Sequence, residues 1–457
     1  MVLAILGGQA WGAGNGTHVE MGRRMLDKHF DQVDEMLPGL GELFASDDLR
    51  RTFYCGCMFP DWGFGALHHE AAEASHWHGF QKVYFAHLEQ RSPWPWDEQA
   101  KRQIAFFMGV LVHGLTDIPW HFNCGKHKAF LKRAQEEDGS EHADMELAVD
   151  VFAHVEQPVP IRATGELWWP YEDLLAVYAR QRLAVTPAQL EEGCKKLIVQ
   201  WNFGAMMSGG VYDWLKLKHR WAQAHWEDYY YGAADHGAAL ASMWIKRAYA
   251  RFRGWRYYQN TPSYVETFPR QAKGTACEDA QLYQARPDDN AGSRPILELG
   301  NDGKGDGRSV LVRFGLSDIK PGTKIQRAHL WLCRAPRRRD NRSREKTIEI
   351  YRANRPRPGG VPAAPDGPAV SSVTIEADFP VGRWVDWDVT SLVQTWINHL
   401  EKNHGMLLQE TAESRKNPGI VHFYSSRACR KPTDGPSQEE TVARRPALVI
   451  MLDRGEH

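Results

Sequence analysis

The chain has 457 residues, which at about 150 residues per domain predicts two or three domains. Its hydrophobic content of 42% and charged content of 25% are typical of a globular protein, and a formal net charge of −1 at pH 7 gives no overall electrostatic reason to expect nucleic acid as a partner. No run of about 18 apolar residues is present, which argues against a transmembrane segment.

The N-terminus begins with a short apolar segment. Val2–Leu6 are apolar, and Gly7–Ala10 place small residues before Trp11. This order is typical of the end of a signal peptide that is cleaved after Ala10, so we interpret residues 1–10 as a signal remnant and expect a secreted or cell-envelope-associated protein. The segment is short and lacks a basic flank, so a start further upstream and the absence of a signal remain alternatives.

Helical patterns follow in the first half of the chain. Thr17–Glu20 has the form of a capping box, and apolar residues at 26, 30, 33 and 37 predict an amphipathic helix with His18 in its first turn. Helical periodicity continues at 98–112, 143–154, 187–201 and 238–253. Pro119 follows His113 and Asp117, so we expect a kink or helix end there that re-aims His121.

Two histidine- and carboxylate-rich segments carry the strongest chemical signal. His113, Asp117 and His121 are spaced by four residues, and His142 and Glu146 repeat that spacing. Residues four apart share one face of a helix, and imidazole and carboxylate groups are both zinc ligands. Five convergent donors exceed the needs of one tetrahedral zinc ion, which predicts a catalytic cluster of metals. The alternative, a closed structural zinc site, is usually rich in Cys.

Aromatic residues and histidines are concentrated in the same half, since 14 of 18 Trp and 15 of 20 His precede residue 257. Some aromatic side chains could form an apolar lip that accepts acyl chains or inserts into a lipid interface, although core packing explains most of them equally well. The candidates are Trp62, Phe64, Trp77, Trp94, Trp96, Trp168 and Trp169.

After Trp255, short alternating runs replace the helical patterns. Strands are predicted at 309–314, 328–332, 347–351, 384–389 and 447–452, separated by turns rich in Gly and Pro. This pattern is typical of a β-sandwich. The predicted fold class is therefore multidomain: an all-α domain over residues 11–256, a linker over 257–276 and an all-β, jelly-roll-like sandwich over 277–453.

The order and spacing of nine residues resemble the zinc-dependent phospholipase C family over about residues 11–250. They are Trp11, His18, Asp61, His76, His113, Asp117, His121, His142 and Glu146. The resemblance implies three Zn²⁺ ions in a cleft of a helical domain. Asp61, His76, His113 and Asp117 would hold the first ion, and Asp117 would bridge to a second ion held by Trp11 and His18. His121, His142 and Glu146 would hold the third. His78 competes with His76 for its role because both lie in one short motif.

The implied activity is hydrolysis of a phospholipid, or of another phosphodiester, by a metal-activated water, with Asp61 as ligand and proton acceptor. One alternative is a single-strand nuclease or nucleotidase with the same metal cluster, which the near-neutral charge disfavours. Another is a surface protein that binds glycan without turnover. The sequence does not define the headgroup preference. The seven Cys are an odd number without zinc-ribbon spacing, so they leave disulfide pairing open.

The C-terminal half resembles the DNRLRE-type β-sandwich domains of secreted bacterial proteins over about residues 277–453. The resemblance rests on Asp279–Gly292, Leu297–Gly300, Arg308–Phe314 and Ile319–Ile325. It implies polysaccharide as a further partner, and a stabilising or spacing module is the alternative.

Overall fold

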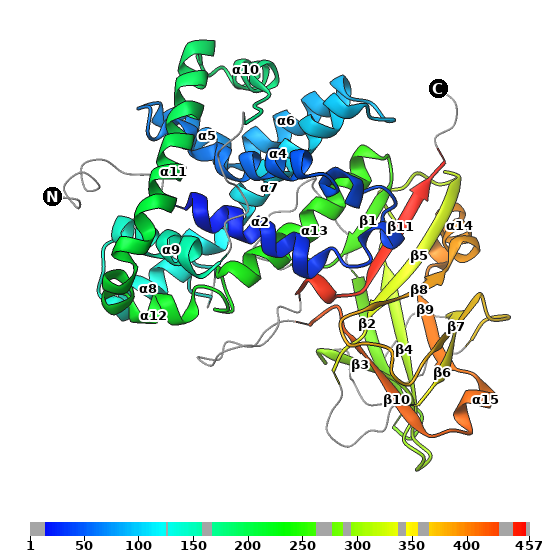
Figure 1. The fold of residues 1–457 in the computed structure, drawn as a ribbon. Helices are drawn as coiled ribbons and strands as arrows, with labels where there is room; N and C mark the ends of the chain where they lie inside the picture. Colours follow the sequence, from blue (N-terminus) through cyan, green and yellow to red (C-terminus); the bar gives the residue numbers. More distant parts are fainter. Residues whose placement is uncertain are drawn as a thin grey trace.

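The computed structural model describes residues 14–124, 127–157, 167–261, 277–286, 294–336, 344–354, 365–428 and 442–453. Within these ranges a helical N-terminal half is followed by a β-rich C-terminal half with antiparallel sheets (Figure 1). The predicted fold class is therefore confirmed. Trp11 and the interpreted signal remnant lie outside the described residues.

Helix α7 forms the centre of the helical half. It is buried from Gln103 to Asp117 and packs against α4 and α13. The longer helices are α2 (Asn15–His29), α4 (Asp47–Met58), α6 (His78–Arg91), α7 (Glu98–His121), α9 (His142–Glu156), α11 (Pro187–Lys218) and α13 (Ala234–Phe252). The shorter ones are α3 (Val33–Met36), η1 (Gly41–Phe44), η2 (Phe59–Gly63), α5 (His69–His76), α8 (Phe130–Asp138), α10 (Tyr171–Arg180) and α12 (Arg220–His225).

The start of α2 differs from the predicted capping box. The helix begins at Asn15 with Gly14 as its N-cap, and no side chain of the helix caps it. The Thr17 hydroxyl instead donates to Asp150 of α9 at 2.8 Å, and Glu20 accepts from Arg23 and Arg24. The capping box is therefore wrong, because Asp150 binds the Thr17 side chain and the neighbouring Arg23 and Arg24 bind that of Glu20. His18 lies in the first turn, as predicted.

The helix end predicted at Pro119 lies two residues later, at His121. Helix α7 continues through Pro119 to His121, and the Phe122 amide donates to the Ile118 carbonyl at 2.8 Å. Proline removes one backbone donor, which a helix tolerates close to its end. His121 therefore stays on the same helical face as Asp117, four residues away.

Two antiparallel sheets enclose the core of the C-terminal half. The smaller has the order β1-β11-β5-β8, with β1 (Arg256–Gln259), β5 (Ile325–Cys333), β8 (Trp384–Asp388) and β11 (Ala447–Leu452). The larger has the order β10-β3-β4-β9-β6-β7, and β2 pairs with β4. Its strands are β2 (Cys277–Tyr283), β3 (Ile296–Asn301), β4 (Gly307–Phe314), β6 (Lys346–Arg352), β7 (Ser371–Ile375), β9 (Met406–Glu410) and β10 (Gly419–Tyr424).

Side chains of both sheets share one buried cluster, which includes Leu330 and Leu448 of the smaller sheet and Val310 and Phe423 of the larger. Helix α14 (Thr390–Asn398) packs on β5 and adds Trp396 to this core, a helical element that the sequence analysis did not predict. Short helical turns η3 (Leu400–Lys402), α15 (Ala412–Arg415) and η4 (Val442–Arg444) complete this half.

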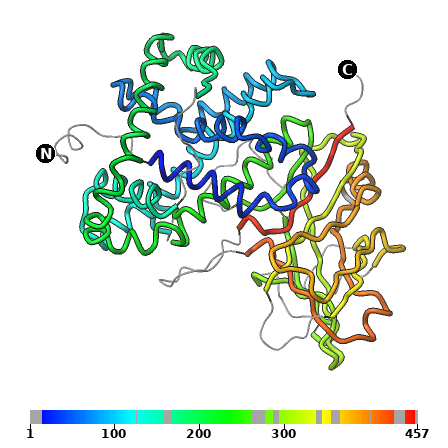
Figure 2. Tube along the Cα trace, in the orientation of Figure 1, coloured from blue at the N-terminus to red at the C-terminus, as the bar shows by residue number. Residues whose placement is uncertain are grey.

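The two halves share a second buried core. Strand β1 follows α13 after a short turn and pairs with β11, so the last strand returns beside the helices (Figure 2). Trp255 and Tyr257 lie in one cluster with Trp331 and Tyr424. Residues 256–259 therefore belong to the sheet, although the prediction placed 257–259 in the linker. Residues 262–276 lie outside the described residues, and the domain limits stay a prediction.

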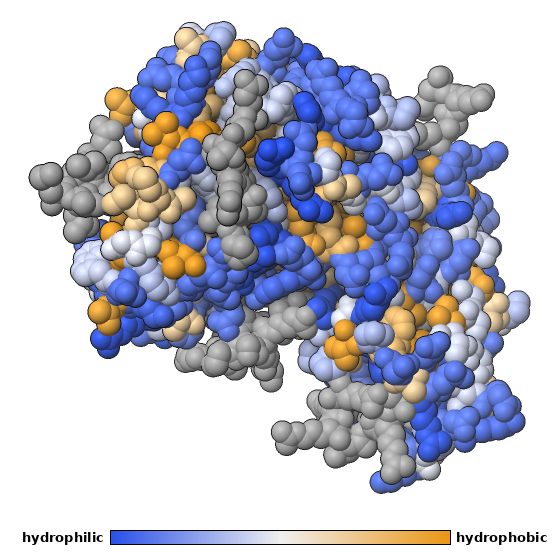
Figure 3. All heavy atoms as spheres, viewed as in Figure 1, coloured by the Kyte–Doolittle hydropathy of each residue, from blue (hydrophilic) through white to orange (hydrophobic). Residues whose placement is uncertain are grey.

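The surface drawn in Figure 3 is mostly hydrophilic with small, separate hydrophobic patches. Among the described residues, none of the helices combines the length and the apolar character that crossing a bilayer requires.

Candidate metal centre

The structure brings the predicted donors together. Three groups have their ligand atoms within 4.8 Å of one another: His18, His113 and Asp117; Asp61, His76 and His113; and His121, His142 and Glu146. Trp11, the ninth predicted residue, lies outside the described residues. His76 belongs to a group and is 5% exposed, whereas His78 begins α6, is half-buried and is in none of them.

Asp117 of α7 connects all three groups. Its Oδ1 lies 3.1 Å from His18 Nε2 and 3.2 Å from His121 Nε2. Its Oδ2 lies 3.9 Å from His76 Nε2 and 4.0 Å from His113 Nε2. A carboxylate with two oxygens directed at different imidazoles has the geometry of a bridging ligand.

The three most buried histidines of the donor groups, His18, His76 and His113, all direct Nε2 into the centre. Nδ1 of His113 lies 2.7 Å from the Cys57 carbonyl, and Nδ1 of His76 lies 2.8 Å from the Ala72 carbonyl. A carbonyl oxygen only accepts, so each Nδ1 carries a proton and Nε2 is the nitrogen that faces the other donors of the centre.

His18 also has a protonated Nδ1, but the acceptor is a side chain, that of Thr116, which was not predicted from the sequence. Its Nδ1 lies 2.8 Å from the Thr116 hydroxyl, which itself donates to the Val112 carbonyl at 2.9 Å. The hydroxyl has one proton, so it accepts from His18 Nδ1 and leaves Nε2 free. Thr116 lies one helical turn before Trp120 and next to Asp117, but a buried threonine in a helix has no sequence signature that distinguishes it from a core residue.

Two glycines allow α4 and α7 to approach closely enough for the His113 contact. A Cβ on Gly56 would lie 2.0 Å from the Phe106 carbonyl oxygen, and a Cβ on Gly109 would lie 2.0 Å from that of Phe53. Cys57 is in the last turn of α4, where carbonyls have no partner within the helix. The close crossing therefore supplies a free backbone acceptor for His113 Nδ1.

Burial and neighbouring charge set the protonation of the donors. Burial, followed by the His18 imidazole, lowers the pKa of His113 to about 3. Burial by itself would raise the pKa of Asp117, but His121 and His18 hold it well below its usual range. Burial likewise opposes the charge on His76, but the hydrogen bond and charge of Asp61 prevail and raise its pKa to about 9.

A neutral imidazole and an ionised carboxylate are the forms that bind a metal. His113 and Asp117 therefore fit a metal centre in the state in which the fold holds them. The three groups combine imidazole and carboxylate donors, and this donor chemistry suits zinc.

The third group is the most accessible. The His142 side chain is 44% exposed, against 3% for His18 and 1% for His113. Glu146 Oε1 lies 3.0 Å from His142 Nε2 and 3.5 Å from His121 Nε2, and burial raises the pKa of this carboxyl. The centre therefore opens to solvent beside His142.

Apolar side chains border this group. Phe122 follows His121 and is 52% exposed, and its ring lies 5.7 Å from that of Trp77, which follows His76. Phe64 packs against His76. Among the other predicted lip residues, Trp62 and Trp96 are buried, and Trp168 and Trp169 pack on Phe106. Trp94 lies under Arg253 instead.

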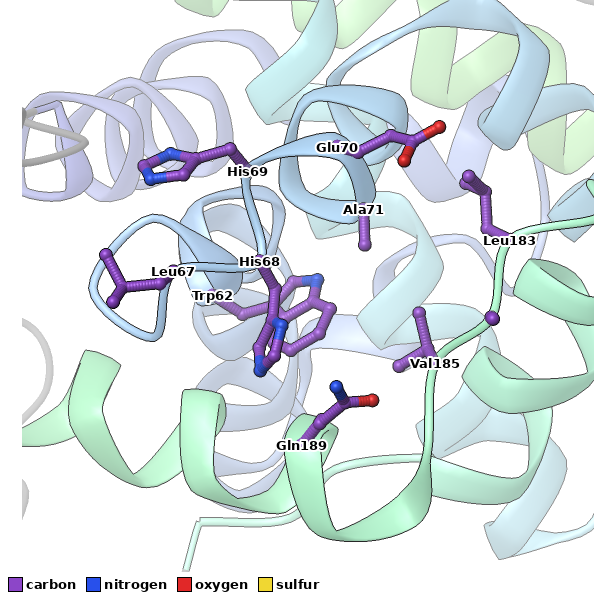
Figure 4. A pocket seen from close by; sticks show the side chains of 10 residues that line it. Trp62, Leu67, His68, His69, Glu70, Ala71, Leu183, Val185 and Gln189 are labelled. Atoms are coloured by element: carbon purple, nitrogen blue, oxygen red, sulfur yellow. The ribbon is translucent and has the colours of Figure 1, made fainter.

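A separate pocket of about 220 Å³ adjoins Trp62 (Figure 4). His68 lies beside the Trp62 ring there, and Gln189 of α11 faces both, while the His69 ring points away. The lining residues are Trp62, Leu67, His68, His69, Glu70, Ala71, Leu183, Ala184, Val185 and Gln189. None of the eight donors lines it, so this pocket is distinct from the metal centre.

Comparison with known families finds two matches. Residues 17–205 match the family described as zinc dependent phospholipase C, and residues 298–448 match the family described as TGF-beta propeptide. All eight described donors lie in the first region. The second match differs from the DNRLRE-type domain that the sequence analysis named, so that resemblance is not confirmed.

Known relatives align with about half of the chain. The chain is 24% identical over 236 residues to phosphatidylinositol-glycan-specific phospholipase D of Homo sapiens, covering 49% of this chain and 27% of that protein. It is 23% identical over 260 residues to the protein of the same name from Dictyostelium discoideum, covering 53% and 25%. The chain thus spans only about a quarter of the length of these relatives.

The first family match confirms the expected resemblance of the helical half to the zinc dependent phospholipase C family and supports zinc as its metal. The buried donors and the matched region coincide, and residues 17–205 are therefore the part of this chain that is similar to the zinc dependent phospholipase C family.

Proposed function

We propose that this protein is a zinc-dependent phosphoric diester hydrolase that cleaves phospholipid in the phospholipase C sense. The observation that carries the proposal is the convergence of three donor groups on Asp117. One ion would be held by Asp61, His76, His113 and Asp117, a second by His18 and Asp117, and a third by His121, His142 and Glu146. Trp11 is proposed as a further ligand of the second ion.

Bound zinc ions would lower the pKa of a water molecule and offset the charge that develops on the phosphoryl oxygens. Asp61 is 5% exposed, and its Oδ1 lies 3.1 Å from His76 Nε2. This contact fixes the carboxylate in the centre, where it can accept the proton of the attacking water. The exposed His142 side would admit the substrate phosphate.

The apolar border supports a lipid substrate over a nucleic acid. Phe122 and Trp77 place two aromatic rings beside the accessible group, which suits an acyl chain or a lipid interface. The names of the relatives add phosphatidylinositol-glycan to the substrates worth testing. Secretion, cleavage after Ala10 and polysaccharide binding by the sandwich stay predictions.

Product analysis on vesicles tests the proposal. Zinc-loaded protein and Asp61→Asn would be incubated with vesicles of phosphatidylcholine and of phosphatidylinositol, and with single-stranded DNA. We expect diacylglycerol and phosphorylated headgroup from the wild type only, and loss of activity with chelator. Release of phosphatidate would refute C-type cleavage, because the bond between phosphate and headgroup would then be the one that breaks. It would still support a phosphoric diester hydrolase. Cleavage of DNA alone, or of no phosphodiester, would contradict the proposal.

A further inference from the structure

The first turn of α2 is capped from outside the helix. The carboxylate of Asp150 on α9 accepts from the Gly14 amide at 3.1 Å, from the Thr17 amide at 3.1 Å and from the Thr17 hydroxyl at 2.8 Å. These amides have no partner within α2, since the first four donors of a helix lack one. Asp150 thus supplies the cap that Gly14 cannot provide.

The position of Asp150 links two parts of the candidate metal centre. His142, Glu146 and Asp150 follow one another at intervals of four on α9, so they share a face of that helix. His18 directly follows Thr17, and its Nε2 lies 3.1 Å from Asp117. The same helical face therefore carries two donors of the third group and the anchor of the helix that carries His18.

The packing around this anchor is close. A Cβ on Gly16 would lie 3.3 Å from Asp150 Oδ1 and 3.3 Å from His154 Nε2. The first turn of α2 therefore lies directly against α9. Three hydrogen bonds to a single carboxylate fix both the position of this turn along the α2 axis and its rotation about that axis. They therefore also fix the direction of the His18 side chain.

We propose that Asp150 is a positioning residue that orients His18 for zinc binding. It does so by holding the first turn of α2 against α9, the helix that carries His142 and Glu146. This inference rests on the proposed function only in taking His18 as a zinc ligand. Asp150 itself has no contact with the three donor groups in the hydrogen bonds described, so it acts through the backbone of α2. Loss of a residue that orients a ligand weakens metal affinity by about 10–100-fold.

The test compares Asp150→Asn with Asp144→Asn in the full-length protein. Asp144 is on the same helix, but its carboxylate pairs with Lys218 at 2.7 Å and not with α2. Zinc per chain would be measured by elemental analysis after dialysis against a graded series of chelator concentrations, with circular dichroism to establish folding. We expect Asp150→Asn to release one zinc ion at about 10-fold lower chelator than the wild type and Asp144→Asn, and to regain it in excess zinc.

Equal zinc retention by Asp150→Asn and the wild type would overturn the inference, as would parallel loss of every ion in a folded protein. If Asp150→Asn does not fold, Thr17→Val removes only the hydroxyl bond, and unchanged zinc retention in that variant would overturn the inference as well. A wild type that binds no zinc would overturn both this inference and the proposed function, whereas a zinc-loaded wild type with an insensitive Asp150→Asn would overturn the inference alone.

Discussion

At the scale of single residues, the centre depends on which nitrogen of each histidine is free. Three imidazoles use Nδ1 as a donor to an oxygen outside the centre, so Nε2 needs no rearrangement to coordinate. The orientation of His18 depends on one hydroxyl, that of Thr116. Thr116 is completely buried, so no water can replace this hydroxyl if it is lost.

Thr116→Val is expected to weaken zinc binding. The substitution keeps the shape of the side chain and leaves the buried Nδ1–H of His18 without an acceptor, which costs about 1–3 kcal/mol. We expect about 10-fold weaker affinity for one zinc ion, measured by competition with a chromophoric chelator. Thr116→Ser retains the hydroxyl and should bind zinc like the wild type; equal affinity in the valine variant would show that this hydroxyl does not orient His18.

The sequence predicted the donors better than their supports. His113, Asp117, His121, His142 and Glu146 are recognisable because the helical period places side chains four apart on one face. The Cys57 and Ala72 carbonyls are backbone atoms, which every residue has, so no sequence pattern identifies them. The capping box failed for a related reason, since Asp150 lies 133 residues from Thr17.

At the scale of elements, the crossing of α4 and α7 determines whether His113 can be oriented. Gly109→Ala places a Cβ 2.0 Å from the Phe53 carbonyl oxygen, so the helices must separate. We expect the free energy of unfolding to fall by about 1–3 kcal/mol, measured by urea denaturation. Gly209→Ala is the matched control, because nothing lies within 4 Å of its Cβ and a helical alanine is favoured by about 1 kcal/mol. Equal unfolding midpoints for Gly109→Ala and the wild type would contradict the close crossing.

The apolar border beside the accessible group has its own expected effect. Phe122→Ser should lower hydrolysis of vesicle phospholipid by about 10-fold, because loss of one large apolar contact with lipid costs about 1.5–3 kcal/mol. Hydrolysis of a soluble short-chain substrate should stay unchanged. Val381→Ser is the control, since Val381 is 51% exposed, close to the 52% of Phe122, but lies in the β-rich half. Equal losses on both substrates would show that Phe122 supports the centre and not lipid binding.

Strands were predicted where apolar residues alternate or cluster. The five predicted runs correspond to β4, β5, β6, β8 and β11, and the other six strands, β1, β2, β3, β7, β9 and β10, were not predicted. Strand β1 was missed because its four residues, Arg256–Gln259, carry no alternation, and β7 because three of the four residues in Ser371–Thr374 are polar. Both are short edge strands whose structure is decided by a neighbour: β1 by β11 and β7 by β6.

At the scale of the whole molecule, the helical half and the sandwich are joined by more than the chain. Trp255 and Tyr257 share a buried cluster with side chains of the smaller sheet. The Gln32 side chain also pairs with the backbone of Trp384, accepting from its amide at 2.8 Å and donating to its carbonyl at 3.3 Å. The sequence predicted two separate folds, but it could not predict this contact, because apolar residues at an interface and in a core have the same pattern.

A fragment that ends at residue 261 should therefore be less stable than the full chain. It would expose the cluster around Trp255 and Tyr257, and each large apolar side chain contributes about 1.5–3 kcal/mol when buried. We expect the thermal midpoint of the helical half to fall by about 10 °C, measured by circular dichroism at 222 nm. A midpoint equal to that of the full chain would show that the halves are energetically independent.

The zinc content of the folded protein tests whether the three donor groups bind zinc. Elemental analysis of the wild type and of His113→Ala, each dialysed against buffer without chelator, would give the ions bound per chain. We expect two or three zinc ions in the wild type and a lower content in His113→Ala, because His113 belongs to two of the three donor groups. One ion or none in the wild type, or an equal content in both proteins, would contradict this expectation.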